Sequence, residues 1–223
     1  MKTANHTAEL SETKRKLLDA GVSLMRAKGF NATTVDDICE TAGVTKGAFF
    51  HYFEGKSDIA KAAIERFREG KHEEFQAAEF RTLADPLDRV YGRLDFIKEN
   101  IGGTKRRTKG CLIGMLAQEL ALTHPEFRSL CQDSFNRIAR EFEADLTAAK
   151  RLHAPNVEFD PKALALLYVS IYQGSTMMAK ASGDNLVMLN NLEQFRRYLD
   201  LLFGRAHRSI ETPTAQASSV SCN

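Results

Sequence analysis

The sequence has only four cysteines, Cys39, Cys111, Cys131 and Cys222. None of them belongs to a Cys-x-x-Cys pair, and none lies in a cluster with histidines. This spacing argues against a zinc site and against a framework of disulfide bonds. We therefore expect free thiols, a reducing cytoplasmic compartment, and no metal or other cofactor.

Long apolar runs are also missing. The N-terminus lacks the apolar stretch of a signal peptide. The longest uncharged stretch, residues 163–179, is interrupted by Gln173 and by hydroxyl side chains. Because it falls short of the roughly 20 apolar residues that span a bilayer, we expect no membrane partner.

The chain has little net charge and few signs of catalytic chemistry. Its 31 Lys and Arg residues nearly balance 29 Asp and Glu residues, for a net charge of +2, so bulk charge does not indicate a nucleic-acid partner. No pattern typical of a catalytic triad stands out, and Gly102-Gly103 is not followed by the Gly-Lys-Ser/Thr of a phosphate-binding loop. We expect no catalytic residues, although a helical enzyme without a known motif stays an alternative.

Helical periodicity fills most of the remaining sequence. A length of 223 residues suits one small and one medium domain. Apolar residues recur at three- and four-residue spacing, and strand-like alternation is not found, so we expect an all-α fold. The expected helices cover about residues 12–28, 34–42, 45–53, 57–80, 85–100, 109–122, 125–152, 160–182 and 186–204. Residues 1–10 are expected to be flexible and residues 208–223 disordered, because both segments are polar and aperiodic.

Two short segments predict a helix-turn-helix over about residues 34–53. Thr34, with Asp37 three residues later, makes a capping-box-like helix start, and Gly43 supplies a tight turn. Phe49 and Phe53 fall on the inward face of the second helix. Its outward face is small or polar over most of its length, as entry into a major groove about 12 Å wide requires.

The run TTVDDICETAGVTKGAFFHYFEGK, residues 33–56, resembles the DNA-binding signature of the TetR (tetracycline-repressor-like) family. With the preceding helix, the resemblance covers about residues 11–71. It implies an N-terminal three-helix DNA-binding domain, followed at about residues 72–207 by a larger helical domain that binds an effector and dimerises. It also implies a cytoplasmic transcriptional regulator, usually a repressor, that an unidentified small molecule releases from a palindromic operator in double-stranded DNA.

The resemblance and the chemistry of the helix-turn-helix together select the expected DNA contacts. Lys46 suits a phosphate or a guanine edge, and Ala48 suits a thymine methyl group. Phe50 stands where the family commonly has tyrosine, so one phosphate hydrogen bond is expected to be lost. The full set is Thr33, Thr34, Thr45, Lys46, Gly47, Ala48, Phe50, His51, Tyr52 and Lys56. A nucleoid-type protein that binds without sequence preference stays an alternative.

The C-terminal helices predict a homodimer. The segment 160–182 is apolar nearly all round, which favours one face against its own domain and another against a second subunit. The resemblance implies that this helix and segment 186–204 pair with their copies as a four-helix interface. Such a dimer presents two recognition helices about 34–36 Å apart, which suits a near-palindromic site.

The resemblance also implies a ligand cavity among the middle helices. Few charged residues are expected in it, which favours an apolar or amphipathic effector; ordinary core packing is the alternative. The residues expected to line it are Leu94, Ile97, Met115, Gln118, Phe135, Tyr168, Tyr172 and Thr176.

Cys111 raises a second regulatory hypothesis. It opens the expected helix 109–122, next to a basic run over residues 105–109, where a thiol pKa could be lowered. Some relatives with a similar Gly-Cys respond to electrophiles or oxidants, so Cys111, with Lys180 as a candidate partner, could act as a thiol sensor. A buried structural cysteine is the competing interpretation.

Overall fold

The computed structural model describes residues 2–102, 108 and 110–205, with side chains from residue 12 onward. This part of the chain contains no strand, so the all-α prediction is confirmed. The helices are α1 (Lys2–Lys28), α2 (Val35–Ala42), α3 (Lys46–Tyr52), α4 (Lys56–Gln76), the 3₁₀ helix η1 (Glu79–Thr82), α5 (Pro86–Ile101), α6 (Leu112–Leu120), α7 (Pro125–His153), α8 (Pro161–Ser182) and α9 (Leu186–Phe203). None of them is long and apolar enough to cross a membrane.

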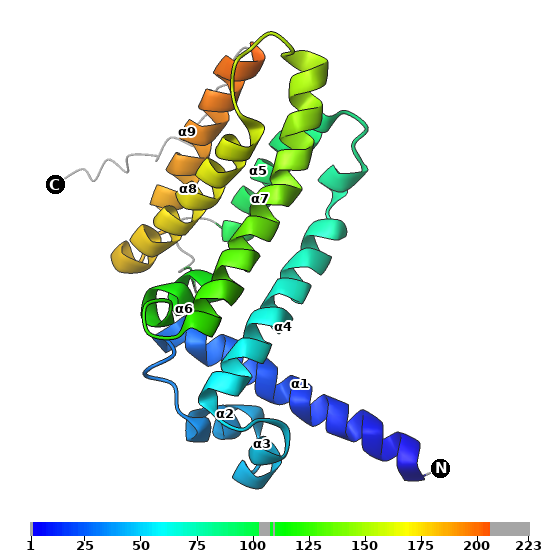
Figure 1. Cartoon of the computed structure of the whole chain (residues 1–223), viewed down its shortest axis with the longest axis vertical. Coiled ribbons are helices and arrows are strands. Elements are labelled where there is room, and N and C mark those ends of the chain that lie inside the picture. The colour runs from blue at the N-terminus through cyan, green and yellow to red at the C-terminus, as the bar shows by residue number, and fades with distance from the viewer. Residues whose placement is uncertain (1, 103–107, 109, 206–223) are drawn as a thin grey trace, which may run out of the picture.

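The molecule is elongated, with α2 and α3 at one end and the bundle of α5, α7, α8 and α9 at the other (Figure 1). Helix α4 runs from the first end toward the second, and α6 lies between them (Figure 1). Two hydrophobic cores correspond to this arrangement. The first contains Leu17, Ile38 and Phe49, and the second contains Leu94 and Phe142.

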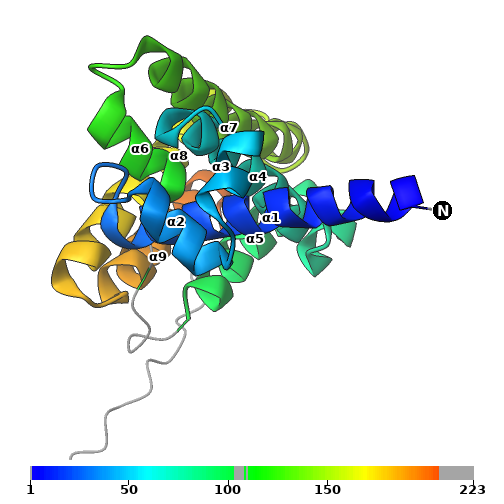
Figure 2. The same ribbon diagram turned by 90° about the horizontal axis from the view of Figure 1, so that it is seen from below.

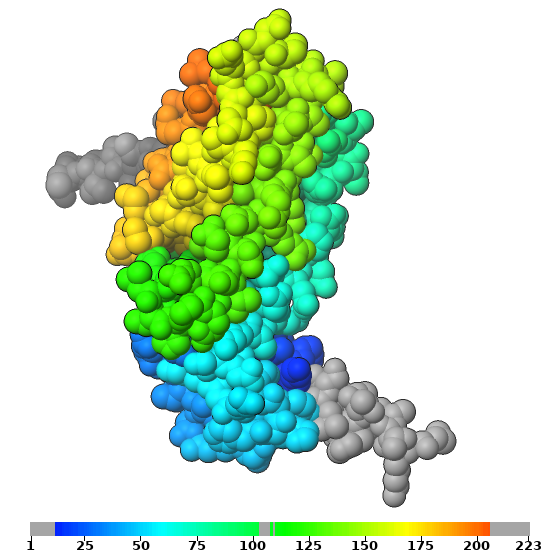
Figure 3. All heavy atoms as spheres, viewed as in Figure 1, coloured from blue at the N-terminus to red at the C-terminus, as the bar shows by residue number. Residues whose placement is uncertain are grey.

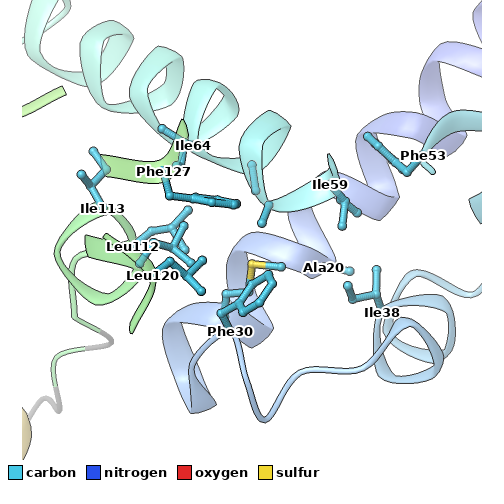
Figure 4. Packing of buried hydrophobic residues seen from close by; sticks show 14 of the residues in the cluster. Ala20, Phe30, Ile38, Phe53, Ile59, Ile64, Leu112, Ile113, Leu120 and Phe127 are labelled. Carbon is cyan, nitrogen blue, oxygen red and sulfur yellow. The ribbon is translucent and has the colours of Figure 1, made fainter. Parts of the chain in front are cut away.

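The first core extends beyond the helix-turn-helix. Leu112 and Leu120 of α6 and Phe127 of α7 pack in the same cluster as Ile64 of α4 and Phe30 (Figure 4). The rings of Phe30 and Phe127 lie 6.1 Å apart. Helix α6 and the start of α7 therefore pack on the helix-turn-helix side of the molecule, although from the sequence we expect them to belong to the second domain.

Two expected helix boundaries were wrong. Helix α4 ends at Gln76 rather than near Phe80, because the chain turns there and buries Phe80 against the Phe96 ring, 5.7 Å away. Gly92 provides the space for this, since a Cβ atom there would lie 2.5 Å from the Cβ of Phe80. Helix α6 begins at Leu112 rather than at residue 109, because Gly110 has φ of +78° and cannot belong to a right-handed helix.

The sequence predicts flexibility at the N-terminus and disorder at the C-terminus. The backbone of α1 is helical from Lys2 across residues expected to be flexible, and that flexibility stays a prediction. The expected disorder of residues 208–223 lies outside the described residues.

Candidate nucleic-acid interface and effector cavity

Helix α2 begins with the expected capping box. The Thr34 hydroxyl accepts a hydrogen bond from the Asp37 amide at 3.1 Å, and the Asp37 carboxylate accepts one from the Thr34 amide at 2.7 Å. Lys28 lies 2.8 Å from the same carboxylate. The hydrogen bonds from Lys28 and Thr34 hold the pKa of Asp37 far below its usual range. The start of the helix-turn-helix is therefore fixed by local polar contacts.

The turn between α2 and α3 depends on Gly43. This residue has φ of +65°, a conformation that costs other residues about 1–2 kcal/mol. It allows the Val44 amide to reach the Cys39 carbonyl at 3.0 Å. Thr45 then caps α3 by accepting a hydrogen bond from the Ala48 amide at 3.2 Å.

Helix α3 is anchored on one side and open on the other. Phe49 is fully buried and Phe53 is 4% exposed, and their rings lie 5.7 Å apart in the first core. Phe50, the next residue after Phe49, is 58% exposed, and its ring lies edge-on to that of Phe49 at 5.2 Å. Figure 2, which views the molecule from this end, shows α2 and α3 on the outer surface. The outward face of α3 is thus available to a partner.

The expected DNA contacts differ in exposure. Thr34, Thr45, Lys46, Gly47, Phe50 and His51 are exposed, Ala48, Tyr52 and Lys56 are half-buried, and Thr33 is buried. The Lys46 ammonium lies 2.7 Å from the Asp36 carboxylate at the surface. The hydroxyls of Thr34 and Thr45 act as helix caps, as described above.

Two of the expected DNA contacts, Thr33 and Lys56, do not fit this conformation. Thr33 is fully buried, and its hydroxyl donates to the Gly29 carbonyl at 2.6 Å. The Lys56 ammonium points inward, where it donates to the Phe30 carbonyl at 3.0 Å and lies 4.3 Å from the centre of the Phe30 ring. Both side chains support the loop between α1 and α2 instead of facing outward.

A cavity of about 480 Å³ lies where α1 and α4 meet α5, α7 and α8. Of the eight residues expected to line it, Ile97, Tyr168 and Tyr172 do so. Burial raises the pKa of both tyrosines, so each hydroxyl keeps its proton and can donate to a ligand.

The other five expected lining residues lie elsewhere. Gln118 is exposed to solvent, and Leu94 is packed inside the second core. Phe135 packs against both cores, Thr176 donates to the Tyr172 carbonyl within α8, and Met115 contacts the Lys180 ammonium. The prediction failed because periodicity identifies the buried face of a helix but not the part of that face that borders a void.

The expectation of few charges in the cavity was also wrong. Its wall includes Arg26, Arg68, Lys71, His72, Glu74, Arg93, Arg137 and Glu141. One sequence signal could have identified Arg93: it follows Val90 by three residues and precedes Ile97 by four, and so lies on the apolar face of α5.

The structure favours a buried cysteine over a thiol sensor at position 111. Cys111 is 7% exposed, and its sulfur accepts a hydrogen bond from the Gln173 amide at 3.5 Å. Lys180 is not its partner, because the Lys180 ammonium donates to the Met115 sulfur at 3.4 Å. The basic residues Lys105, Arg106, Arg107 and Lys109 lie outside the described residues.

Comparison with known proteins identifies the two halves of the chain. The family model for bacterial regulatory proteins of the tetR family matches residues 17–63. The model for the LmrA/YxaF-like C-terminal domain of transcriptional regulators matches residues 86–194.

Individual proteins show the same similarity over most of the chain. Transcriptional regulator AcuR of Cereibacter sphaeroides is 28% identical over 175 residues, covering 77% of this chain and 78% of its own. The HTH-type transcriptional repressor DhaR of Mycobacterium sp. strain GP1 is 23% identical over 194 residues, covering 85% of this chain and 90% of its own. The crystal structure of regulatory protein TetR from Rhodobacter sphaeroides has a TM-score of 0.72 and 26% identity, and covers 85% of this chain and 97% of its own. With a tetR-type helix-turn-helix and a regulator C-terminal domain in one chain, this protein belongs to the TetR family of DNA-binding transcriptional regulators.

Proposed function

We propose that the chain is a homodimeric repressor, which binds a near-palindromic operator through α3 and is released by a small molecule bound in the cavity. The observation that carries the proposal is the geometry of α3, which is anchored by Phe49 and Phe53 and open on its other face. The name of the similar protein DhaR, a transcriptional repressor, supports the direction of regulation.

The DNA contacts follow from the outward face of α3. Lys46 can exchange its surface partner Asp36 for a phosphate at little cost, because exposed ion pairs contribute about 0–1 kcal/mol. Gly47 and Ala48 are small enough for close approach, and His51 and Tyr52 offer polar atoms to the backbone. Phe50 adds an exposed apolar surface that fits a thymine methyl group.

The apolar flank formed by α8 and α9 supports the dimer. Figure 3 shows the two helices, yellow to orange, side by side along one side of the molecule. Their exposed large apolar side chains are Leu166, Leu167, Met177, Met178, Leu186, Tyr198 and Leu201, with exposed fractions from 40% to 81%. Several exposed large apolar side chains on two neighbouring helices are typical of a subunit interface. Two-fold pairing there would give the protein two α3 helices and a preference for symmetric half-sites.

Release by an effector requires that the cavity and α3 belong to one coupled system. Helix α4 contributes Phe67, His72 and Phe75 to the cavity wall, and its first residue, Lys56, holds the loop before α2. A ligand that changes the position of α4 therefore also changes the position of the helix-turn-helix. By linkage, effector and operator must weaken each other's binding by the same factor.

The test uses the purified full-length chain and DNA selected from a random pool. We expect selection to converge on a near-palindrome, with an affinity about 10³-fold or more above that for random DNA at physiological salt. Fluorescence anisotropy over a range of salt concentrations measures both affinities. Equal affinity for selected and random DNA would favour the nucleoid-type alternative, and a monomer on the operator would contradict the dimer.

A further inference from the structure

The cavity wall contains a buried positive charge, the guanidinium group of Arg93, whose hydrogen-bond donors are not all satisfied. Arg93 of α5 is 1% exposed and lines the cavity. Its guanidinium carbon lies 4.8 Å from the centre of the Phe75 ring and 5.4 Å from that of Phe142. Its Nε atom has no hydrogen-bond partner among the described residues. Buried charges in proteins normally have their polar atoms satisfied, so this arrangement calls for a ligand.

The nearest carboxylate, Glu141, is shared among several groups. It lies 3.8 Å from Nη2 of Arg93, 3.6 Å from Nε of Arg137 and 3.3 Å from Nδ1 of His72. The distance to Arg93 exceeds that of a hydrogen bond, and the His72 nitrogen is not aligned for one. One carboxylate thus faces two guanidinium groups, and a net positive charge remains in this part of the cavity.

The other charges on the wall do not change this balance. Lys71 is paired with Glu74 at 2.5 Å, and Nη1 of Arg68 with Glu65 at 2.7 Å. The Nε atom of Arg68, like that of Arg93, is buried without a hydrogen-bond partner among the described residues, but the charge of Arg68 is paired. Arg26 donates to the Gly110 carbonyl at 3.0 Å, a contact that leaves its charge in place. The carboxylates on the wall therefore do not offset all of its positive charge, and Arg93 and Arg137 share Glu141.

We propose that the cavity recognises an organic monocarboxylate, with its carboxylate on Arg93 and its body against the apolar wall. A guanidinium group matches a carboxylate through two parallel hydrogen bonds. Phe96, Ile97 and Val169 supply apolar surface beside it. Glu141 in the same cavity would repel a second negative charge, which disfavours dianions such as phosphate monoesters.

This inference deepens the proposed function and rests on it only in taking the cavity as the effector site. Its test measures ligand binding to the full-length chain without DNA. A failure to find an operator, which would contradict the proposed function, leaves this measurement unaffected.

The probes are sodium benzoate, 4-phenylbutyrate and octanoate, each compared with its neutral primary amide at constant ionic strength. Thermal unfolding and titration calorimetry report binding. We expect at least one acid to raise Tm, and its amide to have no effect at the same concentration. Equal effects of an acid and its amide, or no effect of any of the three acids, would overturn the proposal.

Substitutions of Arg93 and Glu141 test where the carboxylate of the bound acid lies. Arg93→Met is expected to weaken binding of the acid at least 10-fold, with circular dichroism to verify folding. Glu141→Gln gives a second test that does not depend on that variant, because removing the competing carboxylate should tighten binding about 3- to 10-fold. Glu143→Gln removes the same charge from the same helix at a residue that does not line the cavity, and should leave binding unchanged. Unchanged or weaker binding in Glu141→Gln would contradict the assignment.

Discussion

Glu119 of α6 accepts the main-chain amide hydrogens of Phe30, at 3.0 Å, and of Asn31, at 2.9 Å. Together with Lys56, which donates to the Phe30 carbonyl, it fixes the loop that leads into the helix-turn-helix. Gly29 allows this approach, because a Cβ atom there would lie 2.5 Å from the Glu119 carboxylate. The cavity wall includes Cys111 at the start of α6, so this helix joins the cavity to the DNA-binding end.

Glu119→Gln should therefore affect both stability and coupling. The amide can accept at only one oxygen and carries no charge, so we expect the free energy of unfolding to fall by about 1–2 kcal/mol. The response of operator affinity to effector should weaken as well. Urea unfolding and anisotropy measure the two effects. Glu126→Gln, at an exposed position whose carboxylate lies 3.8 Å from Lys61, is the control and should change stability by less than about 0.5 kcal/mol.

Replacement of Lys46 should lower the affinity for DNA, and replacement of Asp36 should raise it. Lys46→Ala removes a phosphate contact, so affinity should fall for operator and random DNA alike, and the slope of log K against log salt should drop by about 1. Asp36→Asn frees Lys46 from its 2.7 Å ion pair and should raise affinity for both. Lys162→Ala, on α8, is the control. A Lys46→Ala variant with unchanged salt dependence would show that this side chain does not contact a phosphate.

Leu201 tests the proposed dimer face. This residue of α9 is 81% exposed in the single chain, so Leu201→Glu should not disturb folding but should raise the dimer dissociation constant at least about 10-fold. Sedimentation velocity over a concentration series measures this change. Leu122→Glu places the same charge on a leucine that is 97% exposed and lies after α6, outside helices α8 and α9. Equal dissociation constants in the two variants would exclude Leu201 from the interface.

Cys131 should make stability depend on pH under alkaline conditions. Burial raises its pKa from an ordinary value of 9.0 to about 11, and the thiol donates to the Ile113 carbonyl at 3.6 Å. Between these two pKa values the folded chain holds a proton that the unfolded chain has lost, so stability falls as pH rises. The loss between pH 8 and pH 10 should be about 1 kcal/mol. Urea unfolding of wild type and Cys131→Ala should reveal it as a difference in pH dependence; parallel curves would contradict it.

The helix-turn-helix was largely predictable because its determinants are local in sequence. Thr34 with Asp37, and Gly43, act over four residues or fewer, and both features appear in the structure as expected. Lys56 was not predictable in this way. Its orientation depends on the carbonyl group of Phe30, 26 residues earlier in the chain.

The cavity could be predicted only in part. Tyr168, Tyr172 and Ile97 lie on strongly apolar helix faces and were identified. Arg93 and Glu141 were missed, because their meeting depends on how α5 packs against α7. Periodicity predicts the buried face of each helix separately, but it does not predict which residues of two helices contact each other.

The shared core of α1, α4, α6 and the start of α7 limits how this protein can be divided. A fragment ending at residue 71 would lose Leu116 and Phe127 and leave the apolar side of α4 bare in water. Engineers who wish to graft its DNA specificity onto another sensor must therefore transfer α6 and the first turns of α7 as well. In the proposed release from the operator, these two segments should therefore move together with α3.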